Sequence, residues 1–392
     1  MQRVVWITKQ YWLKQGPMTY MGLLNARAFA ENDVVTDFFV CADAQHDPAD
    51  TEQELSEFYG LQQHKNLTVH CINESKGSQR RVYKAAVAAI IAYCAKGEVL
   101  AVTREYGALT ELLKLKKKCP GLKVLYETHN FFINLKHLDR RLFSLSRIRT
   151  QWVERNILPK ADGLICLTEH QRALYQHWFP QLPAIALPLG CLDFPKYPEP
   201  EQRRLKRRIA YIGHLYSYKG LELFFELAKQ LKPANIELHI FGGYEAEVIT
   251  LRQRAEQEGL ANVLFFKSFV EPKILHDILA DEISIGLVPL QDTFYNRYLT
   301  CPVKVLDFAA HGLPIISSDL PSVRDILRDS GIYCDSQDAA EFAARAILLL
   351  DDADAYLRAS QASYNRCREL LWRLRAQRIL KFADEKKSAA AI

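Results

Sequence analysis

The sequence lacks an apolar segment long enough to cross a membrane. Its longest apolar run, around residues 85–95, is about ten residues long and includes Tyr93 and Cys94, whereas a membrane-spanning helix needs ~20 residues. After Arg3 the chain goes almost directly into a strand-like VVWI, without the apolar core and small-residue cleavage site of a signal peptide. We therefore expect no transmembrane helix, no export and a cytoplasmic protein.

Several common cofactor and metal motifs are also missing. The nine cysteines are scattered without a Cys-x-x-Cys pair, and we interpret them as reduced core thiols. Neither the Gly-x-Gly-x-x-Gly spacing of nicotinamide-dependent dehydrogenases nor the P-loop pattern occurs. A zinc site at His129 is not expected because no third ligand follows at suitable spacing. We expect no cofactor, and nothing in the sequence indicates that a metal is required.

The composition is that of a folded globular protein. Hydrophobic residues make up 49% of the chain and charged residues 25%. A length of 392 residues exceeds one ordinary core and favours two domains of about 200 residues or slightly fewer. We found no internal repeat at a solenoid period.

Basic residues gather in two stretches, although the net charge is only +5. One lies between Lys136 and Lys160, and the other covers residues 114–123. Solvated helix faces explain such stretches in most proteins. The alternative is attraction to an anionic membrane surface or to an anionic glycan acceptor. We expect no nucleic-acid partner because the nearby aromatic residues show no stacking pattern.

Both halves of the chain predict parallel strand–helix units. Short β-branched runs alternate with longer amphipathic segments, which is typical of α/β folds with doubly wound sheets. In the first half we predict strands at 4–7, 35–40, 67–71, 99–102, 123–126, 163–167 and 184–187. In the second half we predict strands at 209–212, 236–241, 263–266, 283–288 and 313–317.

A change in composition marks the boundary between these halves. Residues 180–208 are rich in proline and end in RRLKRR, which is typical of a linker. We place one domain at residues 1–195 and the other at 205–371. Beyond residue 339 only helices are expected, one at 339–350 and a long one at 355–383, in which Trp372 lies to one side of the apolar stripe.

Three loops of the first half follow predicted strands, where ligands of open parallel sheets bind. Gly16 precedes a helical run and can let a ligand approach the backbone, or it can form a plain turn. Arg104 can bind phosphate or pair with Glu105. Glu127 and His129 suit acid–base chemistry or the binding of sugar hydroxyls, although a lone histidine is more often structural.

In the second half, residues 299–327 read LTCPVKVLDFAAHGLPIISSDLPSVRDIL. Pro302 suits the first turn of a helix, and Gly312 predicts its end. The start of this helix, near Thr300, offers backbone N–H groups to a phosphate. Asp307 can accept hydrogen bonds from a sugar diol, whereas Lys304 can be explained by a simple ion pair with Asp307.

Lys219 lies at a predicted helix start in the segment GHLYSYKG. Its ammonium group and nearby backbone N–H groups can neutralise a leaving diphosphate. A lysine near a helix start is, however, unremarkable on an exposed surface without any such role.

Taken together, these stretches resemble the GT-B glycosyltransferases, specifically the retaining, nucleotide-sugar-dependent enzymes of family four (group 1). In the second half the resemblance rests on IAYIGHLYSYKG at 209–220, LHIFGG at 238–243, IGLVPL at 285–290 and the segment from 301 to 327. In the first half it rests on VLAVTREYGALTELL at 99–113 and VLYETHNFF at 124–132. The order and spacing of these motifs make the resemblance specific, and it covers most of the chain.

The resemblance implies two Rossmann-like domains that face a cleft, with a C-terminal helix, about 372–392, returning to the N-terminal acceptor-binding domain. The C-terminal domain would bind the donor. The implied reaction transfers a hexose from a nucleoside diphosphate sugar to a hydroxyl of a glycan or lipid-linked acceptor, with retention of configuration, in polysaccharide or lipopolysaccharide synthesis. A place at the inner face of the membrane would fit such an acceptor.

It also implies residue roles. His129 would line the donor-sugar pocket, and Lys219 would stabilise the leaving diphosphate. Asp307 would bind the ribose hydroxyls, and Gly16 would lie in the loop that approaches donor and acceptor. The remaining donor-binding positions are Gly213, Gly243, Thr300, Cys301, Pro302, Val303 and Lys304, with the backbone around 300–303 holding the diphosphate. Arg104 and Glu127 are candidates for phosphate or acceptor contact.

Two positions differ from the family pattern. Leu299 stands where the first of two glutamates is common, and His214 stands where an arginine usually follows a glycine. These differences leave open a non-catalytic module that binds a nucleotide or glycan. A GT-B nucleotide-sugar epimerase is a further alternative, and it would need additional acid–base carboxylates.

Overall fold

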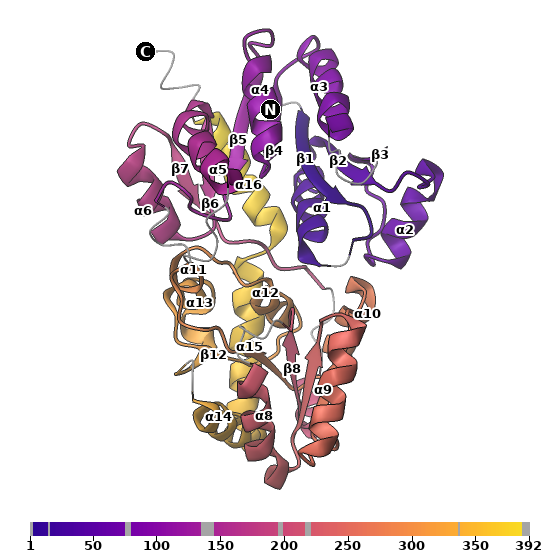
Figure 1. Cartoon of the computed structure of the whole chain (residues 1–392), viewed down its shortest axis with the longest axis vertical. Helices are drawn as coiled ribbons and strands as arrows, with labels where there is room; N and C mark the ends of the chain where they lie inside the picture. Colours follow the sequence, from indigo (N-terminus) through magenta and orange to yellow (C-terminus); the bar gives the residue numbers. More distant parts are fainter. Residues whose placement is uncertain are drawn as a thin grey trace. The chain divides into compact units, whose positions relative to one another are not determined.

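The computed structural model describes residues 3–14, 16–74, 80–134, 145–194, 199–215, 221–335 and 338–385. The chain forms two compact units. Unit 1 comprises Met1–Leu189 and Trp372–Ile392, and unit 2 comprises Gly190–Leu371. Each unit contains its own parallel sheet with helices packed on it (Figure 1). The prediction of two Rossmann-like α/β domains is confirmed.

The sheet of unit 1 has the strand order β3-β2-β1-β4-β5-β6-β7, and all neighbours are parallel. The strands are β1 Arg3–Tyr11, β2 Val35–Ala42, β3 Leu67–Asn73, β4 Val99–Thr103, β5 Leu122–Glu127, β6 Gly163–Cys166 and β7 Ala184–Ala186. The order reverses between β1 and β4. In doubly wound sheets ligands bind beyond the strand ends at such a reversal.

The helices of unit 1 are α1 Pro17–Ala30, α2 Thr51–Glu57, α3 Arg80–Cys94, α4 Tyr106–Leu115, α5 Leu145–Asn156, α6 Glu169–Trp178 and α16 Trp372–Asp384. Helix α1 packs on β1 and β2 and lies beside α16, while α3 packs on the same strands and touches α4 (Figure 1). The last described helix of the chain is therefore part of the unit that contains the first strand.

Unit 2 repeats this plan with the order β10-β9-β8-β11-β12-β13, which reverses between β8 and β11. Its strands are β8 Arg208–Ile212, β9 Glu237–Phe241, β10 Leu264–Lys267, β11 Ile285–Val288, β12 Ile315–Ser318 and β13 Gly331–Cys334. Its helices are α7 Pro200–Lys206, α8 Leu221–Leu231, α9 Glu245–Gln257, α10 Pro272–Asp281, α11 Phe294–Tyr298, α12 Val303–Ala310, α13 Pro321–Leu327, α14 Ala339–Asp351 and α15 Ala353–Glu369. The sequence analysis missed β13 and several of the shorter helices.

The prediction of one long helix at 355–383 is wrong. The helix is interrupted at Leu370 and Leu371, because the backbone of Leu371 forms an isolated β-bridge with that of Cys191. The Cys191 N–H donates to the Leu370 carbonyl at 2.8 Å, which takes an acceptor away from the helix. Because the helix restarts at Trp372, this side chain lies on the buried face of α16 and not beside it.

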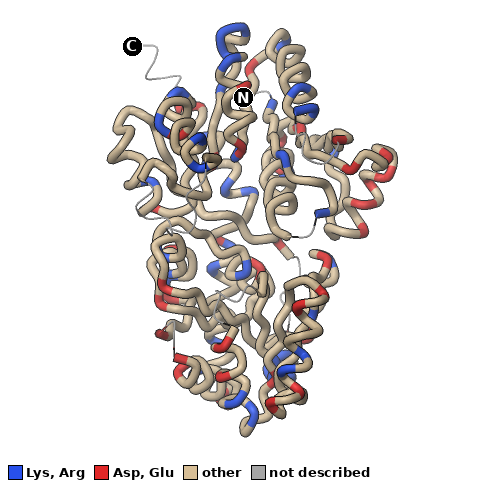
Figure 2. Tube along the Cα trace, in the orientation of Figure 1, with Lys and Arg blue, Asp and Glu red and all other residues tan. Residues whose placement is uncertain are grey.

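The cysteines lie as predicted, whereas part of the basic run at 114–123 makes contacts within the protein. All nine cysteines are free thiols, and eight of them are buried. The basic run after α4, coloured blue in Figure 2, contributes to internal contacts, because Lys116 pairs with Asp162 at 2.7 Å and Lys123 Nζ donates to the Ala383 carbonyl. In the other basic stretch, residues 136–144 belong to the segment 135–144, which lies outside the described residues.

Within the described residues, no helix has both the length and the apolar character that a bilayer crossing demands.

Candidate functional site

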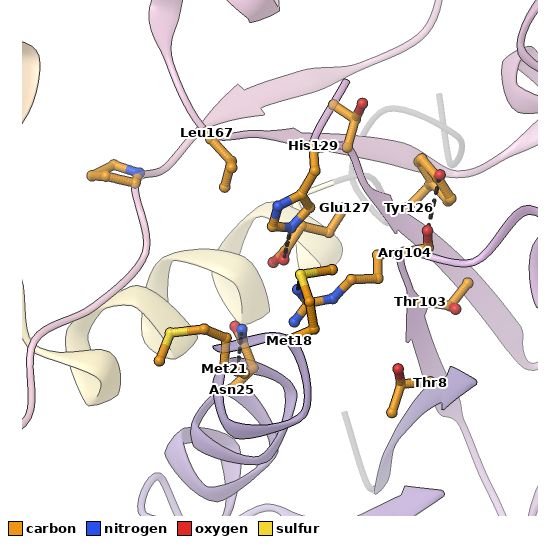
Figure 3. A network of polar contacts seen from close by, with 12 residues as sticks. Thr8, Met18, Met21, Asn25, Thr103, Arg104, Tyr126, Glu127, His129 and Leu167 are labelled. Atoms are coloured by element: carbon orange, nitrogen blue, oxygen red, sulfur yellow. Dashed lines mark hydrogen bonds and ion pairs between the residues drawn. The ribbon is translucent and has the colours of Figure 1, made fainter. Parts of the chain in front are cut away.

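The strand ends of unit 1 bring together three of the predicted loops. β1 leads towards Gly16 and α1, β4 leads to Arg104, and β5 ends at Glu127, two residues before His129. Figure 3 shows Arg104, Glu127 and His129 close to one another, with Met18 from the first turn of α1 beside them. Sequence reasoning placed these side chains at strand ends, and the sheet order makes them neighbours.

Gly16 is the N-cap of α1 and has a φ of 108°. Residues other than glycine rarely adopt this backbone conformation. Apart from its chain neighbours, no atom of the described residues lies within 4 Å of the place where a Cβ would stand. The turn therefore requires glycine for its backbone conformation, and the space beside it is open. Among the described residues no side chain caps the helix start, and the first N–H groups of a helix have no partner within the helix itself.

A buried ion pair fixes the orientation of His129. Glu127 is fully buried, and its two carboxylate oxygens contact His129 Nε2 and Arg375 Nη2, both at 2.8 Å. Arg375 comes from α16, donates through Nε to the Pro188 carbonyl at 2.8 Å and bonds to the Asn25 side chain. Two other segments of unit 1 therefore hold Arg375, which binds Glu127, and Glu127 in turn holds His129.

The electrostatics of this group determine the protonation of His129. Burial would raise the pKa of Glu127, but Arg375 and the hydrogen bond from His129 outweigh it and hold that pKa well below its usual range. Burial lowers the pKa of His129, against the effect of the hydrogen bond to Glu127 and with support from the charge of Arg104. At neutral pH the pair is thus a carboxylate and a neutral imidazole.

This protonation pattern defines what His129 can bind. An ionised carboxylate only accepts hydrogen bonds, so Nε2 of His129 carries the hydrogen that points to Glu127. The neutral ring then presents Nδ1 as an acceptor. The side chain of His129 remains 19% exposed. It is therefore suited to accept a hydrogen bond from a sugar hydroxyl.

In unit 2, two glycine turns touch each other beside the strand reversal. The Gly213 N–H, after β8, donates to the Phe241 carbonyl at the end of β9 at 2.9 Å. A Cβ on Gly242 would lie only 2.2 Å from the Gly213 carbonyl oxygen. Gly242 and Gly243 also have φ angles of 133° and 86°. Close approach of the two backbones therefore requires glycine at position 242.

Helix α12 starts at Val303, with Pro302 as its N-cap, and ends where Gly312 adopts a φ of 60°. The sequence analysis placed Pro302 inside the first turn, one residue too early. The Thr300 N–H already donates to the Tyr295 carbonyl at 3.1 Å. The N–H groups at the start of α12 that lack an intrahelical carbonyl therefore begin after Pro302.

The polar side chains of α12 are Lys304 and Asp307. The Lys304 ammonium lies 3.8 Å from the centre of the Tyr211 ring, next to Gly213. Burial raises the pKa of Asp307 to about 7, although Lys304 acts in the opposite direction. The Asp307 carboxyl thus changes charge near neutral pH, and in its ionised form it can accept both hydrogen bonds of a diol.

The remaining positions divide into three groups. Cys301 and Leu299 are buried, the latter at the end of α11, where an apolar side chain packs in the core. His214 is exposed in the turn after β8. Lys219 lies outside the described residues.

Sequence reasoning missed Arg375 and Asn25, which bond to each other in unit 1. One signal was available for Arg375. It lies on the buried stripe formed by Trp372, Ala376, Ile379 and Ala383, where a charged residue is unusual unless it has a buried partner. Asn25, inside a helix without a distinctive pattern, gave no comparable signal.

No group of three or more His, Cys, Asp or Glu side chains suited to a metal ion occurs in the described part of the chain. The independence from metals and other cofactors stays a prediction.

Comparison with solved structures identifies the class of the fold as GT-B. Sucrose-phosphate synthase from Thermosynechococcus elongatus matches with a TM-score of 0.71 and 17% identity, over 99% of this chain and 100% of that one. TarM from S. aureus, in complex with UDP and other ligands, matches with a TM-score of 0.69 and 11% identity over 98% and 100%. Anabaena HepE in complex with UDP-glucose matches with a TM-score of 0.65 and 13% identity over 99% and 100%. At these identities the likeness establishes the fold alone.

A family model matches part of the sequence of unit 2. Residues 206–352 match the family described as Glycosyl transferases group 1, and this segment includes Gly213, Gly243 and Asp307. This part of the chain is therefore similar to group 1 glycosyltransferases, and the predicted enzyme class, a glycosyltransferase, is confirmed. Among curated proteins, none matches the sequence.

Proposed function

We propose that the protein is a retaining glycosyltransferase that moves a hexose from a nucleoside diphosphate sugar to a hydroxyl group of a glycan or lipid-linked acceptor. One observation carries the proposal. The segment that matches the glycosyltransferase family carries both Lys304 and Asp307 on the short helix α12, and the Lys304 ammonium lies beside the turn at Gly213. An acidic side chain on a helix whose N-terminal end carries a partial positive charge suits a ligand that carries both a diol and phosphates.

Unit 2 is the proposed donor-binding part. The first turn of α12 supplies N–H groups and a partial positive charge for a diphosphate. Lys304 adds a cation beside Gly213, 3.8 Å from the centre of the Tyr211 ring. Asp307 would accept hydrogen bonds from the ribose hydroxyls, and Lys219 would stabilise the leaving diphosphate. Stabilisation of the leaving group in this way is electrostatic and needs no metal.

Unit 1 is the proposed acceptor-binding part, and His129 would contact the transferred sugar. Because the ring is neutral, it would accept a hydrogen bond from a sugar hydroxyl through Nδ1. The pair formed by Glu127 and Arg375 supports this role, since both oxygens of Glu127 are already bonded and the imidazole cannot rotate without losing its contact.

A panel of UDP-, GDP- and ADP-sugars tests the proposal. Release of nucleoside diphosphate that depends on an acceptor would support it, and UDP-sugars come first because UDP or UDP-glucose is bound in similar solved structures. Nucleotide binding without turnover, whichever acceptor is offered, would identify a non-catalytic module. Conversion of the sugar nucleotide to an epimer without an acceptor would identify an epimerase.

We also propose that the protein, in the cytoplasm, contacts an anionic membrane surface through α5. Leu145, Ile148 and Trp152 on this helix are 87%, 47% and 56% exposed, and their spacing places them along one side. Arg149 is exposed on the same helix, and Arg147 is partly exposed. An exposed apolar stripe beside basic residues is typical of helices that lie in a membrane interface. Such contact would suit a lipid-linked acceptor in polysaccharide synthesis.

A further inference from the structure

Among the described residues, the Arg104 guanidinium has no carboxylate or carbonyl partner, although its central carbon lies 5.8 Å from the centre of the Trp6 ring. The residue is only 8% exposed. Its Nη1 lies 3.9 Å from the Met18 sulfur, which is a weak acceptor. Within the described residues, Nε and Nη2 are buried without a hydrogen-bond partner. Because unpaired buried donors are costly, such an arrangement in a folded protein calls for an explanation.

The acidic residues near Arg104 are already engaged elsewhere. Glu105 lies 3.4 Å from the Lys9 ammonium and also accepts from Thr8. Both oxygens of Glu127 are occupied by His129 and Arg375, as described above. Since His129 is neutral, the buried charges here are those of Arg104, Arg375 and the Glu127 carboxylate. The group therefore carries one more positive than negative charge, which favours an anion as the missing partner.

The start of α1 lies at the same point. Met18 belongs to the first turn of this 14-residue helix and touches the Arg104 guanidinium, and Figure 3 shows the two side chains next to each other. Among the described residues, no side chain caps this helix and no atom beyond the chain neighbours fills the space beside Gly16. The N-terminal end of a helix dipole and an unpaired guanidinium thus meet where the strand order reverses between β1 and β4.

We propose that Arg104 and the first turn of α1 bind an anionic group, a phosphate or a carboxylate, of the acceptor. A guanidinium that offers two N–H groups matches the paired oxygens of such a group. Met18 covers the guanidinium with a flexible side chain that is 38% exposed, and it moves aside when the anion binds. The acceptor's identity rests on the proposed glycosyltransferase function, whereas the anion site itself does not.

Calorimetric titration of the full chain with inorganic phosphate, at constant ionic strength, tests the site. The wild-type protein should bind phosphate saturably, and Arg104→Met should bind it about tenfold more weakly or worse. Arg104→Lys keeps the positive charge but loses the paired N–H donors of the guanidinium, and it should show an intermediate affinity. Arg172→Met is the control, because this surface arginine pairs with Glu169 on its own helix; its affinity should remain that of the wild type.

Two results would overturn the site: no saturable phosphate binding by the wild type, or equal binding by a folded Arg104→Met variant with an unchanged circular dichroism spectrum. Competition with UDP then shows whether the site binds a phosphate of the donor nucleotide or an anionic group of the acceptor. If UDP displaces the bound phosphate from the wild type, the anion belongs to the donor and the acceptor assignment is wrong. If both bind together, the acceptor assignment stands. If phosphate binding depends on Arg104 but the protein transfers no sugar, the proposed function is refuted and the anion site is still supported.

Discussion

Glu127 and Arg375 form a buried ion pair at 2.8 Å although 248 positions separate them in the chain. The pair connects α16 with the end of β5. Because the other oxygen of Glu127 contacts His129, helix α16 determines the orientation of a side chain that belongs to the candidate site. Arg375 is therefore a positioning residue, since it acts on the site through Glu127.

Replacing Arg375 should affect both stability and turnover. Arg375→Met leaves Glu127 buried without its countercharge, and breaking a buried pair in this way costs about 3–5 kcal/mol. We expect a marked loss of thermal stability and, at temperatures where the variant is folded, lower turnover with little change in nucleotide affinity. Thermal unfolding and steady-state kinetics measure the two effects.

Arg373→Met is the matched control, because Arg373 lies exposed on the same helix. It should behave as the wild type in both measurements. Wild-type turnover in a folded Arg375→Met variant would show that the ion pair is only structural.

Asp307 should make nucleotide binding depend on pH. The pKa of its carboxyl lies at about 7 because burial raises it, so the fraction that is ionised increases from pH 6 to pH 8. Since the ionised form accepts both hydrogen bonds of a diol, affinity for UDP should rise over this interval. Calorimetry at several pH values measures the change.

Asp307→Asn should bind UDP more weakly at pH 8 and lose most of this pH dependence. Asp277→Asn, an exposed position on α10 of the same unit, serves as the control. Unchanged affinity in the Asp307 variant would refute the ribose-binding role.

The side chains of Asp307, Glu127 and His129 show how far the sequence was informative. Asp307 lies in a short helix between Pro302 and Gly312, and these two residues indicate its start and end from the local sequence alone. The predicted start was off by one residue. Glu127 and His129 follow a strongly apolar strand, so local pattern also placed them at a strand end. Local patterns of this kind need no knowledge of distant parts of the chain.

Long-range contacts could not be predicted in the same way. The partner of Glu127 was missed because nothing local to position 127 identifies a residue on the last helix. The break at Leu370 was missed because it arises from backbone near Cys191. Likewise, the unpaired state of Arg104 depends on Lys9 engaging Glu105, which only the folded sheet reveals.

A buried histidine pair should make unit 2 sensitive to acid. His276 Nδ1 lies 2.9 Å from His311 Nε2, and the Phe194 ring stacks on His311. Burial lowers the pKa of His276 to about 4, and burial, His276 and Arg203 lower that of His311. Both rings are thus neutral in the folded protein at pH 7.

The sign of the effect follows from proton linkage. The unfolded chain binds protons at a pKa of about 6.5, so the folded state loses stability as the pH falls below 6.5, until the folded pKa of about 4 is reached. At pH 5 the loss from His276 alone is about 2 kcal/mol. Thermal unfolding between pH 7 and pH 5 should show a falling midpoint, and His276→Gln should fall less steeply. Parallel slopes for the two proteins would contradict this.

The turn at Gly242 should tolerate no side chain. Gly242→Ala would place a Cβ 2.2 Å from the Gly213 carbonyl oxygen and would also keep a φ of 133°. We expect clear destabilisation and weaker UDP binding, because the turn at Gly213 must move. Gly259→Ala is the control, since Gly259 has a φ of 67° but open space around it, and it should cost only about 1 kcal/mol. Equal losses in the two variants would show that the contact between the turns does not matter.

The membrane proposal for α5 separates into an apolar and an electrostatic part. Trp152→Ser removes an exposed aromatic ring, and the double variant Arg147→Gln, Arg149→Gln removes two positive charges. Both should reduce sedimentation with liposomes that contain anionic lipid, because apolar burial and charge attraction contribute together. Only the arginine variant should lose its sensitivity to salt, since screening acts on charge alone. Trp178→Ser, at another exposed tryptophan of the same unit, controls for a general loss of surface hydrophobicity. If both α5 variants pellet as the wild type does, α5 is not the membrane-binding surface.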